Sequence, residues 1–252
     1  MMAPSPPPRR RSSCRDTPGL LDTLIAGRRA LMVVASPAEA TAILRALGQG
    51  AEAEPWRLLE LTDRLDLLVT GVGKTCAAGA VARALDPDRH AAVLSLGVAG
   101  ALPGSGLEPG VSVLADASVF ADEGVVTPDG FTDLAEMGFP SAPGLGVAVP
   151  TDPRLSAALA PIADARGTIA TVSTCSGTDA QAALVVARTG AIAEAMEGAA
   201  VGVVTARVGV SAGRSSAFAE VRVISNTTGR RGQQRWGLAG ALDRLGGLAG
   251  LL

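Results

Sequence analysis

The segment EAMEGAA at residues 194–200 carries the pattern that decides the fold, because a short apolar run changes there into a run of small residues. Residues 191–196 are typical of a buried strand end and residues 198–204 of a helix with little side-chain bulk, so Glu197 is expected at a strand-to-helix turn. Ligands bind at such turns in open α/β sheets. A carboxylate that only accepts hydrogen bonds suits a vicinal diol such as that of a ribose. The alternative is a helix N-terminal glutamate stabilised by the helix dipole.

Similar strand-to-helix changes recur along the chain. Strands are predicted at 31–35, 65–70, 91–96, 111–120, 167–173, 191–196 and 219–225. Helices are predicted at 38–47, after residue 73 to about 85, and from residues 152, 179, 197 and about 234, with a loop rich in Pro and Gly at 127–150. This alternation predicts an α/β fold with a largely parallel, twisted sheet covered on both faces. Active groups are then expected at the carboxyl ends of the strands.

The composition bounds the class of protein. Of 252 residues, 48% are apolar and 18% are charged, which is ample material for one large domain, expected over residues 21–252. Residues 1–20 are rich in Pro, Arg and Ser and are expected to form a disordered tail. The net charge of −2 argues against a nucleic-acid partner, and no apolar run reaches the about 18 residues of a membrane span. The three cysteines are unevenly spaced and form no CxxC pair, so they support neither a zinc site nor a disulfide framework, and a reducing cytoplasm is the default expectation.

Carboxylates must carry any acid-base chemistry. The single histidine, His90, follows a turn and is expected to be solvated, which excludes histidine triads and multi-histidine metal sites. Glu39 is expected in the first turn of the first helix, where acidic residues are also frequent for dipole reasons. There its carboxylate could orient and deprotonate a water. A nucleoside N-glycosidic bond breaks through an oxocarbenium-like sugar, so such a base suffices without a metal or a covalent nucleophile.

Asn226 follows an apolar strand and is expected to project into the same cleft. Its amide offers a donor beside an acceptor, which matches a purine N7–H beside an O6 and would favour hypoxanthine or guanine. Asparagine is also a common turn former. The small residues Gly97, Val98, Ala99 and Gly100 end another predicted strand; they either let backbone approach a flat ligand or serve packing.

The segment TGVGKT at residues 70–75 resembles a P-loop but fails the pattern, because Leu68 stands where a glycine is required. A tight strand-to-helix turn is the expected role. An anion could still be held at the N-terminus of the following helix.

Together these motifs resemble the nucleoside phosphorylase and nucleosidase superfamily, and within it most closely the futalosine hydrolases, with the methylthioadenosine/S-adenosylhomocysteine nucleosidases nearby. The resemblance covers nearly all of residues 30–245. It is carried by residues 33–39, 71–74, 96–100, 121–124, 127–131, 171–179, 194–200, 220–226 and 236.

This resemblance implies a three-layer α/β/α sandwich with a mixed, largely parallel sheet. It implies hydrolysis of futalosine to hypoxanthine and dehypoxanthinyl futalosine in menaquinone biosynthesis, without a cofactor or metal, by a homo-oligomer of at least two chains. It assigns Glu39 to the attacking water, Met196 and Glu197 to the ribose, and Asn226 to the base. Phe131 would form a wall for the aromatic arm of the substrate, and the backbone of Val98, Ala99 and Gly100 would line the site.

Three alternatives remain open from the sequence. They are another purine nucleosidase, a purine nucleoside phosphorylase with Lys74 as a phosphate-binding candidate, and a non-catalytic nucleoside-binding protein. The chain also departs from the family after Asn226, where residues 227–234 (TTGRRGQQ) replace the usual Gly-Pro-Arg-Asp. The role of this loop in closing the pocket therefore stays open.

Overall fold

The computed structural model describes residues 19–25, 27–142 and 144–252. Nearly all of the expected N-terminal tail lies outside these residues. Nine strands of the described chain form one sheet in the order β10-β9-β5-β11-β4-β1-β3-β2, with β8 paired to β5. Their bounds are β1 (Arg29–Val34), β2 (Leu58–Glu60), β3 (Leu65–Val69), β4 (His90–Ala101), β5 (Ser112–Phe120), β8 (Ala148–Pro150), β9 (Ala165–Thr171), β10 (Ala193–Ala195) and β11 (Ala217–Thr227).

The sheet is mixed, with its central strands parallel, as the resemblance implied. β1 pairs in parallel with β3 and β4, β11 pairs in parallel with β4, and β9 pairs in parallel with β5 and β10. The antiparallel pairs are β11–β5, β2–β3, β5–β8 and a short β10–β4 contact. The ends of β1, β4 and β11 therefore lie together at one edge of the sheet.

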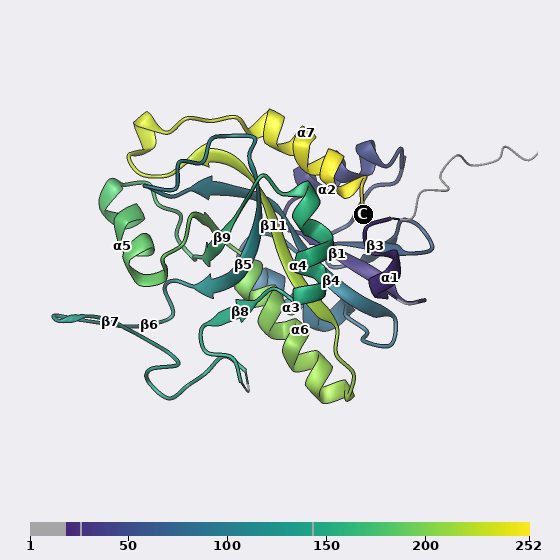
Figure 1. Cartoon of the computed structure of the whole chain (residues 1–252), viewed down its shortest axis with the longest axis horizontal. Helices are drawn as coiled ribbons and strands as arrows, with labels where there is room; N and C mark the ends of the chain where they lie inside the picture. Colours follow the sequence, from purple (N-terminus) through teal and green to yellow (C-terminus); the bar gives the residue numbers. More distant parts are fainter. Residues whose placement is uncertain (1–18, 26, 143) are drawn as a thin grey trace, which may run out of the picture.

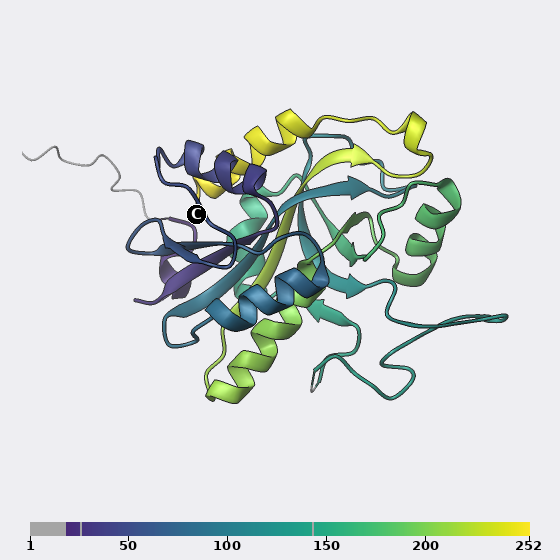
Figure 2. The ribbon, with the colours of Figure 1, turned by 180° about the vertical axis from the view of Figure 1, so that it is seen from behind.

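Helices cover both faces and complete the three layers (Figures 1 and 2). On one face lie α1 (Asp22–Ile25), α2 (Pro37–Ala46), α4 (Pro153–Leu159), the 3-10 turn η1 (Ala160–Ile162) and α7 (Leu238–Ala249). α3 (Lys74–Ala84) and α6 (Gly198–Ala212) pack on the other face, and α5 (Asp179–Thr189) packs beside β9. Alternate residues of one strand face opposite layers: Leu94 of β4 packs with the first group and Val93 with the second. The predicted three-layer sandwich is confirmed.

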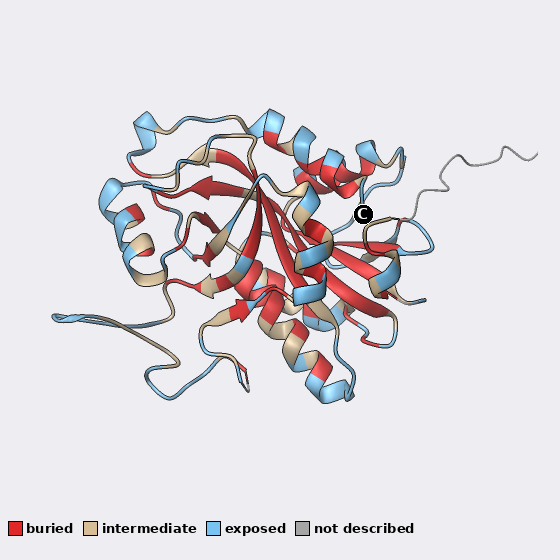
Figure 3. Cartoon of the chain, in the orientation of Figure 1, coloured by how far each residue is buried: buried red, intermediate tan, exposed pale blue. Residues whose placement is uncertain are grey.

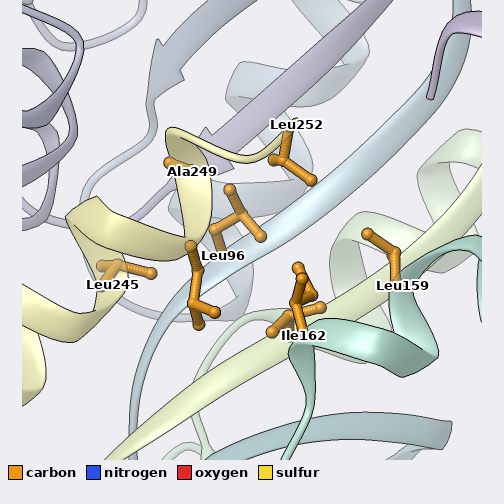
Figure 4. Close-up of a pocket in the computed structure, with 8 residues that line it drawn as sticks. Leu96, Leu159, Ile162, Leu245, Ala249 and Leu252 are labelled. Carbon is orange, nitrogen blue, oxygen red and sulfur yellow. The ribbon is translucent and has the colours of Figure 1, made fainter. Parts of the chain in front are cut away.

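Burial explains why the central strands read as continuous apolar runs. Almost every residue of β1, β3, β4 and β11 is buried, as expected for strands covered on both faces (Figure 3). A small apolar cavity of about 10 Å³ lies between α7, η1, β4 and β11, lined by Leu96, Ile162, Leu245 and other aliphatic side chains (Figure 4). With no polar partner for a water, this space is a packing gap. None of the helices in the described part of the chain has the length and apolarity needed to cross a bilayer.

The structure corrects several predicted boundaries. The segment expected as a loop at 127–150 contains β7 (Gly130–Asp133) and β8; with β6 (Gly124–Thr127), β7 forms a hairpin that projects from the body. Its four-residue strands are largely exposed, so they leave no apolar period in the sequence. The C-terminal helix begins at Leu238 rather than near 234, because residues 231–233 form the separate 3-10 turn η2 (Arg231–Gln233). The strand expected at 167–173 runs from 165 to 171.

The prediction of a solvated His90 is wrong. His90 is the first residue of β4 and is fully buried, with Nε2 3.0 Å from Oδ2 of Asp66. Its Nδ1 accepts from the backbone N–H of Asp86, so Nε2 carries the proton and donates to the aspartate. The neighbour that buries this histidine comes from β3, which local sequence does not reveal.

Candidate functional site

Glu39 lies at the edge where β1 and β4 end, and its carboxylate is held from two sides. It is the third residue of α2 and forms a capping box with Ser36, so the dipole-related interpretation also holds. Oε2 accepts from N–H of Ala35 and of Ser36 and from Oγ of Ser36, at 2.8 to 3.0 Å. Oε1 accepts from N–H of Val98 at 2.9 Å, 59 residues away in sequence. All four partners are donors, so the arrangement suits a carboxylate of fixed orientation.

Glu197 occupies the predicted position between β10 and α6, and it is 5% exposed. Its Oε1 accepts from N–H of Gly73 at 3.0 Å, and its Oε2 accepts from N–H of Met196 at 3.3 Å. Gly73 has φ 97°, a left-handed conformation that favours glycine. The glycine-rich turn at the start of α3 therefore binds the carboxylate of Glu197. This is the helix N-terminus at which the sequence allowed an external anion.

Arg222 is the site residue that the sequence reasoning missed. It lies on β11 directly opposite Gly97 of β4 and is 1% exposed. Its Nη1 is 3.2 Å from Oε2 of Glu197, and a Cβ placed on Gly97 would lie 2.5 Å from Oε1 of Glu39 and 2.6 Å from Nη1 of Arg222. The glycine thus leaves the room in which Glu39 and Arg222 approach each other. A charged residue inside the apolar run 217–225 was the available signal.

The electrostatics of this cluster favour a permanently charged guanidinium. Burial alone lowers the pKa of Arg222, but the charges of Glu220, Glu197 and Glu39 outweigh it and hold this pKa above its ordinary range. Nε of Arg222 donates to Oε1 of Glu220 at 2.7 Å, and Nη2 donates to Oγ of Ser95 at 3.0 Å. The arginine therefore neutralises part of a densely acidic site.

Asn226 lies opposite Gly100 of β4, next to a register shift in β11. Its Nδ2 donates to the carbonyl of Thr227 at 2.9 Å, and its Oδ1 is 2.8 Å from Oγ of Ser225. A Cβ on Gly100 would lie only 2.7 Å from Cγ2 of Thr228, so the glycine makes room for that side chain, and Nδ2 of Asn226 and Cγ of Glu194 lie nearby at 3.4 and 3.6 Å from the same point. One N–H and one lone pair of the amide stay available for a ligand.

Glu194 of β10 lies close to Gly100 of β4 and is buried. Its two oxygens accept from N–H and Oγ of Ser176 at 2.7 and 2.6 Å. Burial raises the pKa of Glu194, and the hydrogen bonds from Ser176 oppose this shift only in part. Cys175 is an exposed residue, but partial burial of its thiol and the charges of Glu194 and Glu197 raise its pKa above the ordinary value, which disfavours the nucleophilic thiolate.

Lys74 is held by acidic neighbours. Its Nζ lies 2.6 Å from Oδ1 of Asp122 and 3.0 Å from Oε1 of Glu123, and 5.4 Å from the ring centroid of Phe120. Lys74, Asp122, Glu123 and Met196 line a hollow of about 530 Å³ that also includes Gly73. The charge of Lys74 is thus already compensated.

Phe131 is not brought to this hollow. It lies on β7 of the projecting hairpin, with the guanidinium of Arg188 4.2 Å from its ring centroid. It lines a separate hollow of about 610 Å³ between the hairpin, α5 and the end of β5. Within the described residues, no group of His, Cys, Asp and Glu side chains is arranged to hold a metal ion.

The loop at residues 227–234, whose sequence differs from the family pattern, is hydrogen-bonded to residues 176–179 at the start of α5. N–H of Gly229 donates to the carbonyl of Ser176, N–H of Arg231 to that of Gly177, and N–H of Arg230 to Oδ1 of Asp179. Arg231 also stacks 4.7 Å above the ring centroid of Trp236. The loop is thereby ordered without the aspartate that is usual in the family.

Comparison with known proteins identifies the family. The model of the phosphorylase superfamily matches residues 30–243. The chain is 39% identical to futalosine hydrolase of Acidothermus cellulolyticus over 222 residues, covering 85% of this chain and 86% of that protein. It is 35% identical to futalosine hydrolase of Streptomyces coelicolor over 209 residues, covering 77% and 83%.

Solved structures share the fold. A futalosine hydrolase mutant of Helicobacter pylori matches with a TM-score of 0.69 at 18% identity, over 88% of this chain and 96% of that one. A 5′-methylthioadenosine/S-adenosylhomocysteine nucleosidase of Neisseria meningitidis matches with a TM-score of 0.68 at 19% identity, over 89% and 100%. With the sequence relatives and the geometry above, these comparisons assign the chain to the phosphorylase superfamily and, within it, to the family of the futalosine hydrolases.

Proposed function

We propose that this protein is a purine nucleosidase that hydrolyses the N-glycosidic bond of futalosine, releasing hypoxanthine and dehypoxanthinyl futalosine for menaquinone biosynthesis. The observation that carries the proposal is the Glu39–Arg222–Glu197 cluster at the strand ends, in a chain whose relatives are futalosine hydrolases. In this proposal Glu39 orients and deprotonates the attacking water, and Glu197 binds the sugar.

The reaction needs little from the protein beyond position and charge. Glu39 orients a water and accepts its proton as the water attacks the anomeric carbon. The surrounding carboxylates stabilise the positive charge that develops on the sugar ring. Glu197 binds the ribose hydroxyls, next to Met196; the long 3.3 Å bond from N–H of Met196 is the contact that yields most easily to a hydroxyl. The C–N bond breaks with its electron pair on the purine, which takes up a proton from solvent, and the free N–H and lone pair of Asn226 bind this leaving 6-oxopurine.

Hydrolysis is favoured over phosphorolysis by the charges already in place. Phosphate requires free cations or free backbone N–H groups. Lys74 is paired with Asp122 and Glu123, and Arg222 is paired with Glu197 and Glu220. The N–H groups near the ends of β1 and β4 bind Glu39, and that of Gly73 binds Glu197. A neutral water fits this acidic site better than a phosphate ion.

The decisive assay incubates the protein with futalosine, inosine and methylthioadenosine, with and without phosphate, and follows release of the free base. We expect hypoxanthine from futalosine at a rate that phosphate does not change. Turnover that depends on phosphate would identify a phosphorylase, and faster release of adenine from methylthioadenosine would identify the other nucleosidase branch. Binding without release from any of the three would identify a non-catalytic nucleoside-binding protein.

Phe131 is proposed as part of the wall around the aromatic arm of the substrate. The ring lines a hollow that shares Phe120 with the surroundings of Lys74, and Arg188 stacks on it. Replacing Phe131 by Ala is expected to raise KM for futalosine more than KM for inosine, which lacks the arm. Equal changes for the two substrates would remove this residue from the site.

We further propose a homo-oligomer of at least two chains in the cytoplasm. Val126 and Phe139, on and after the hairpin, are 72% and 66% exposed, with Val125 and Met137 nearby in sequence, and such apolar side chains are typical of covered surfaces. Cys76 and Cys175 are free thiols, as in a reducing compartment. Light scattering after gel filtration gives the mass, and a Val126→Glu variant is expected to dissociate the assembly.

A further inference from the structure

Glu220 is a buried acid that the proposed reaction does not use. It lies on β11 two residues before Arg222, so the two side chains leave the strand on the same face. Glu220 is fully buried. Its Oε1 accepts from Nε of Arg222 at 2.7 Å, and its Oε2 is hydrogen-bonded to Oγ of Ser118 on β5. Burying a carboxylate costs desolvation free energy, which these two hydrogen-bond partners offset in part.

The start of helix α6 is built around this carboxylate. A Cβ placed on Gly198 would lie 1.9 Å from Oε2 and 2.2 Å from Cδ of Glu220. No other residue fits after Glu197, since any side chain at 198 would displace the acid. Glu220 therefore lies directly beneath the turn that presents Glu197 to the sugar.

Glu220 also fixes the direction of the guanidinium. The Arg222 fork is planar, so a bond at Nε and one at Nη2 set where Nη1 points. Glu220 and Ser95 supply those two bonds, and Nη1 then meets Oε2 of Glu197 at 3.2 Å. The contact with Glu220 is shorter and comes from a side chain that the sheet and Gly198 hold in place on both sides.

On the basis of the proposed function, we propose that Glu220 is a positioning residue: it aims Arg222 so that the Glu197 carboxylate stays where it recognises the ribose 2′-hydroxyl. It touches no substrate and acts only through Arg222 and the turn at Gly198. Loss of its charge frees the guanidinium to turn towards Glu197 or Glu39. The contact of Glu197 with the sugar then loosens, and selectivity for a ribose over a 2′-deoxyribose falls.

The test compares kcat/KM for futalosine and for its 2′-deoxy analogue in the full chain and in Glu220→Gln. Gln keeps the size and an oxygen acceptor but removes the charge. We expect kcat/KM for futalosine to fall about tenfold and the ratio of the two substrates to shrink at least about threefold. Asp66→Asn, a matched acid-to-amide change at the far end of the sheet, should leave the ratio unchanged. An equal loss for both substrates, or an unchanged Glu220→Gln enzyme, would overturn the proposal.

If Glu220→Gln does not fold, the variant Ser118→Ala provides a second test. It removes only the outer partner of Glu220, and we expect the same ratio to shrink about twofold; no shift would overturn the proposal. Failure of the wild-type chain to release hypoxanthine from futalosine would reject the proposed function instead. The positioning role would then be decided by the affinities of inosine and 2′-deoxyinosine for the wild-type and Glu220→Gln chains, where an unchanged preference for inosine rejects it.

Discussion

The two ends of the sheet bury acidic groups in opposite electrostatic settings. At the amino end, Asp66 is hydrogen-bonded by Arg29, Arg89 and His90. At the carboxyl end, Glu39, Glu197 and Glu220 surround Arg222. Two arginines contact the one buried carboxylate at the first end, whereas three carboxylates surround one buried arginine at the second, among the side chains described. The first arrangement stabilises the fold, whereas the second concentrates negative charge, which under the proposed function would face a cationic sugar.

The pKa values follow this contrast. Burial by itself raises the pKa of Asp66, but hydrogen bonds from His90, Arg89 and Arg29 outweigh it and hold this pKa well below its ordinary value of 3.8. Burial raises the pKa of Glu220 above its ordinary value of 4.5, and the charge of Arg222 only partly opposes it. The surroundings of Asp66 therefore favour its ionised form, whereas ionisation of Glu220 costs stability.

The largest expected effect belongs to the carboxyl end. Glu39→Gln removes the base but keeps the size of the side chain, so kcat for hypoxanthine release should fall by about a thousandfold. Calorimetric binding of inosine should persist within about threefold, because Glu197 and Asn226 are unchanged. A variant that keeps most of its turnover would remove Glu39 from the reaction.

At the amino end of the sheet, we expect a substitution to lower the free energy of unfolding without lowering kcat. Asp66→Asn leaves Arg29, Arg89 and His90 around a neutral amide, and breaking such a buried ionic contact costs about 3 kcal/mol. Urea unfolding at neutral pH measures the free energy, and kcat well below the melting temperature measures the activity. If kcat fell along with stability, the two ends of the sheet would not be separable in function.

A smaller effect concerns the sugar. Glu197 is expected to accept charge-assisted hydrogen bonds from the ribose hydroxyls, so the 2′-deoxy analogue of futalosine should be about tenfold worse in kcat/KM than futalosine. The comparison needs only the wild-type enzyme and two substrates. A preference for the deoxy compound would contradict the assignment of Glu197.

The smallest effects are in the pH dependence of stability. A lowered folded-state pKa stabilises above the unfolded value and is lost on acidification, so the Tm deficit of Asp66→Asn should shrink as pH falls below 3.8. The raised folded-state pKa of Glu220 has the opposite effect. The stability that protonated Glu220 contributes is present below pH 4.5 and is lost as pH rises. Glu220→Gln should therefore gain Tm relative to wild type as pH rises above 4.5. Differences that do not change with pH would show that neither acid titrates as described.

Local sequence was enough where a strand end and the following turn contain the whole signal. Ser36 and Glu39 are three residues apart and form the capping box of α2, and Glu197 stands between the predicted strand and helix. Glu220 and Arg222 escaped because they sit inside an apolar strand, and their partners Ser118, Ser95 and Glu197 come from other segments of the chain. His90 was misjudged for the same reason, since Asp66 comes from a neighbouring segment of sheet.

The sequence by itself determined the alternation of strands and helices and the placement of Glu39 and Glu197 at strand-to-helix turns, because apolar period and turn chemistry act over a few neighbouring residues. The family followed from the resemblance of its motifs. Only the tertiary structure decided that N–H of Gly73 binds a carboxylate 124 residues away and that Arg222 pairs with Glu197. Those contacts depend on the order of the strands and on their register, which are properties of the whole sheet. The physical reason is that burial and charge balance are set by non-local neighbours.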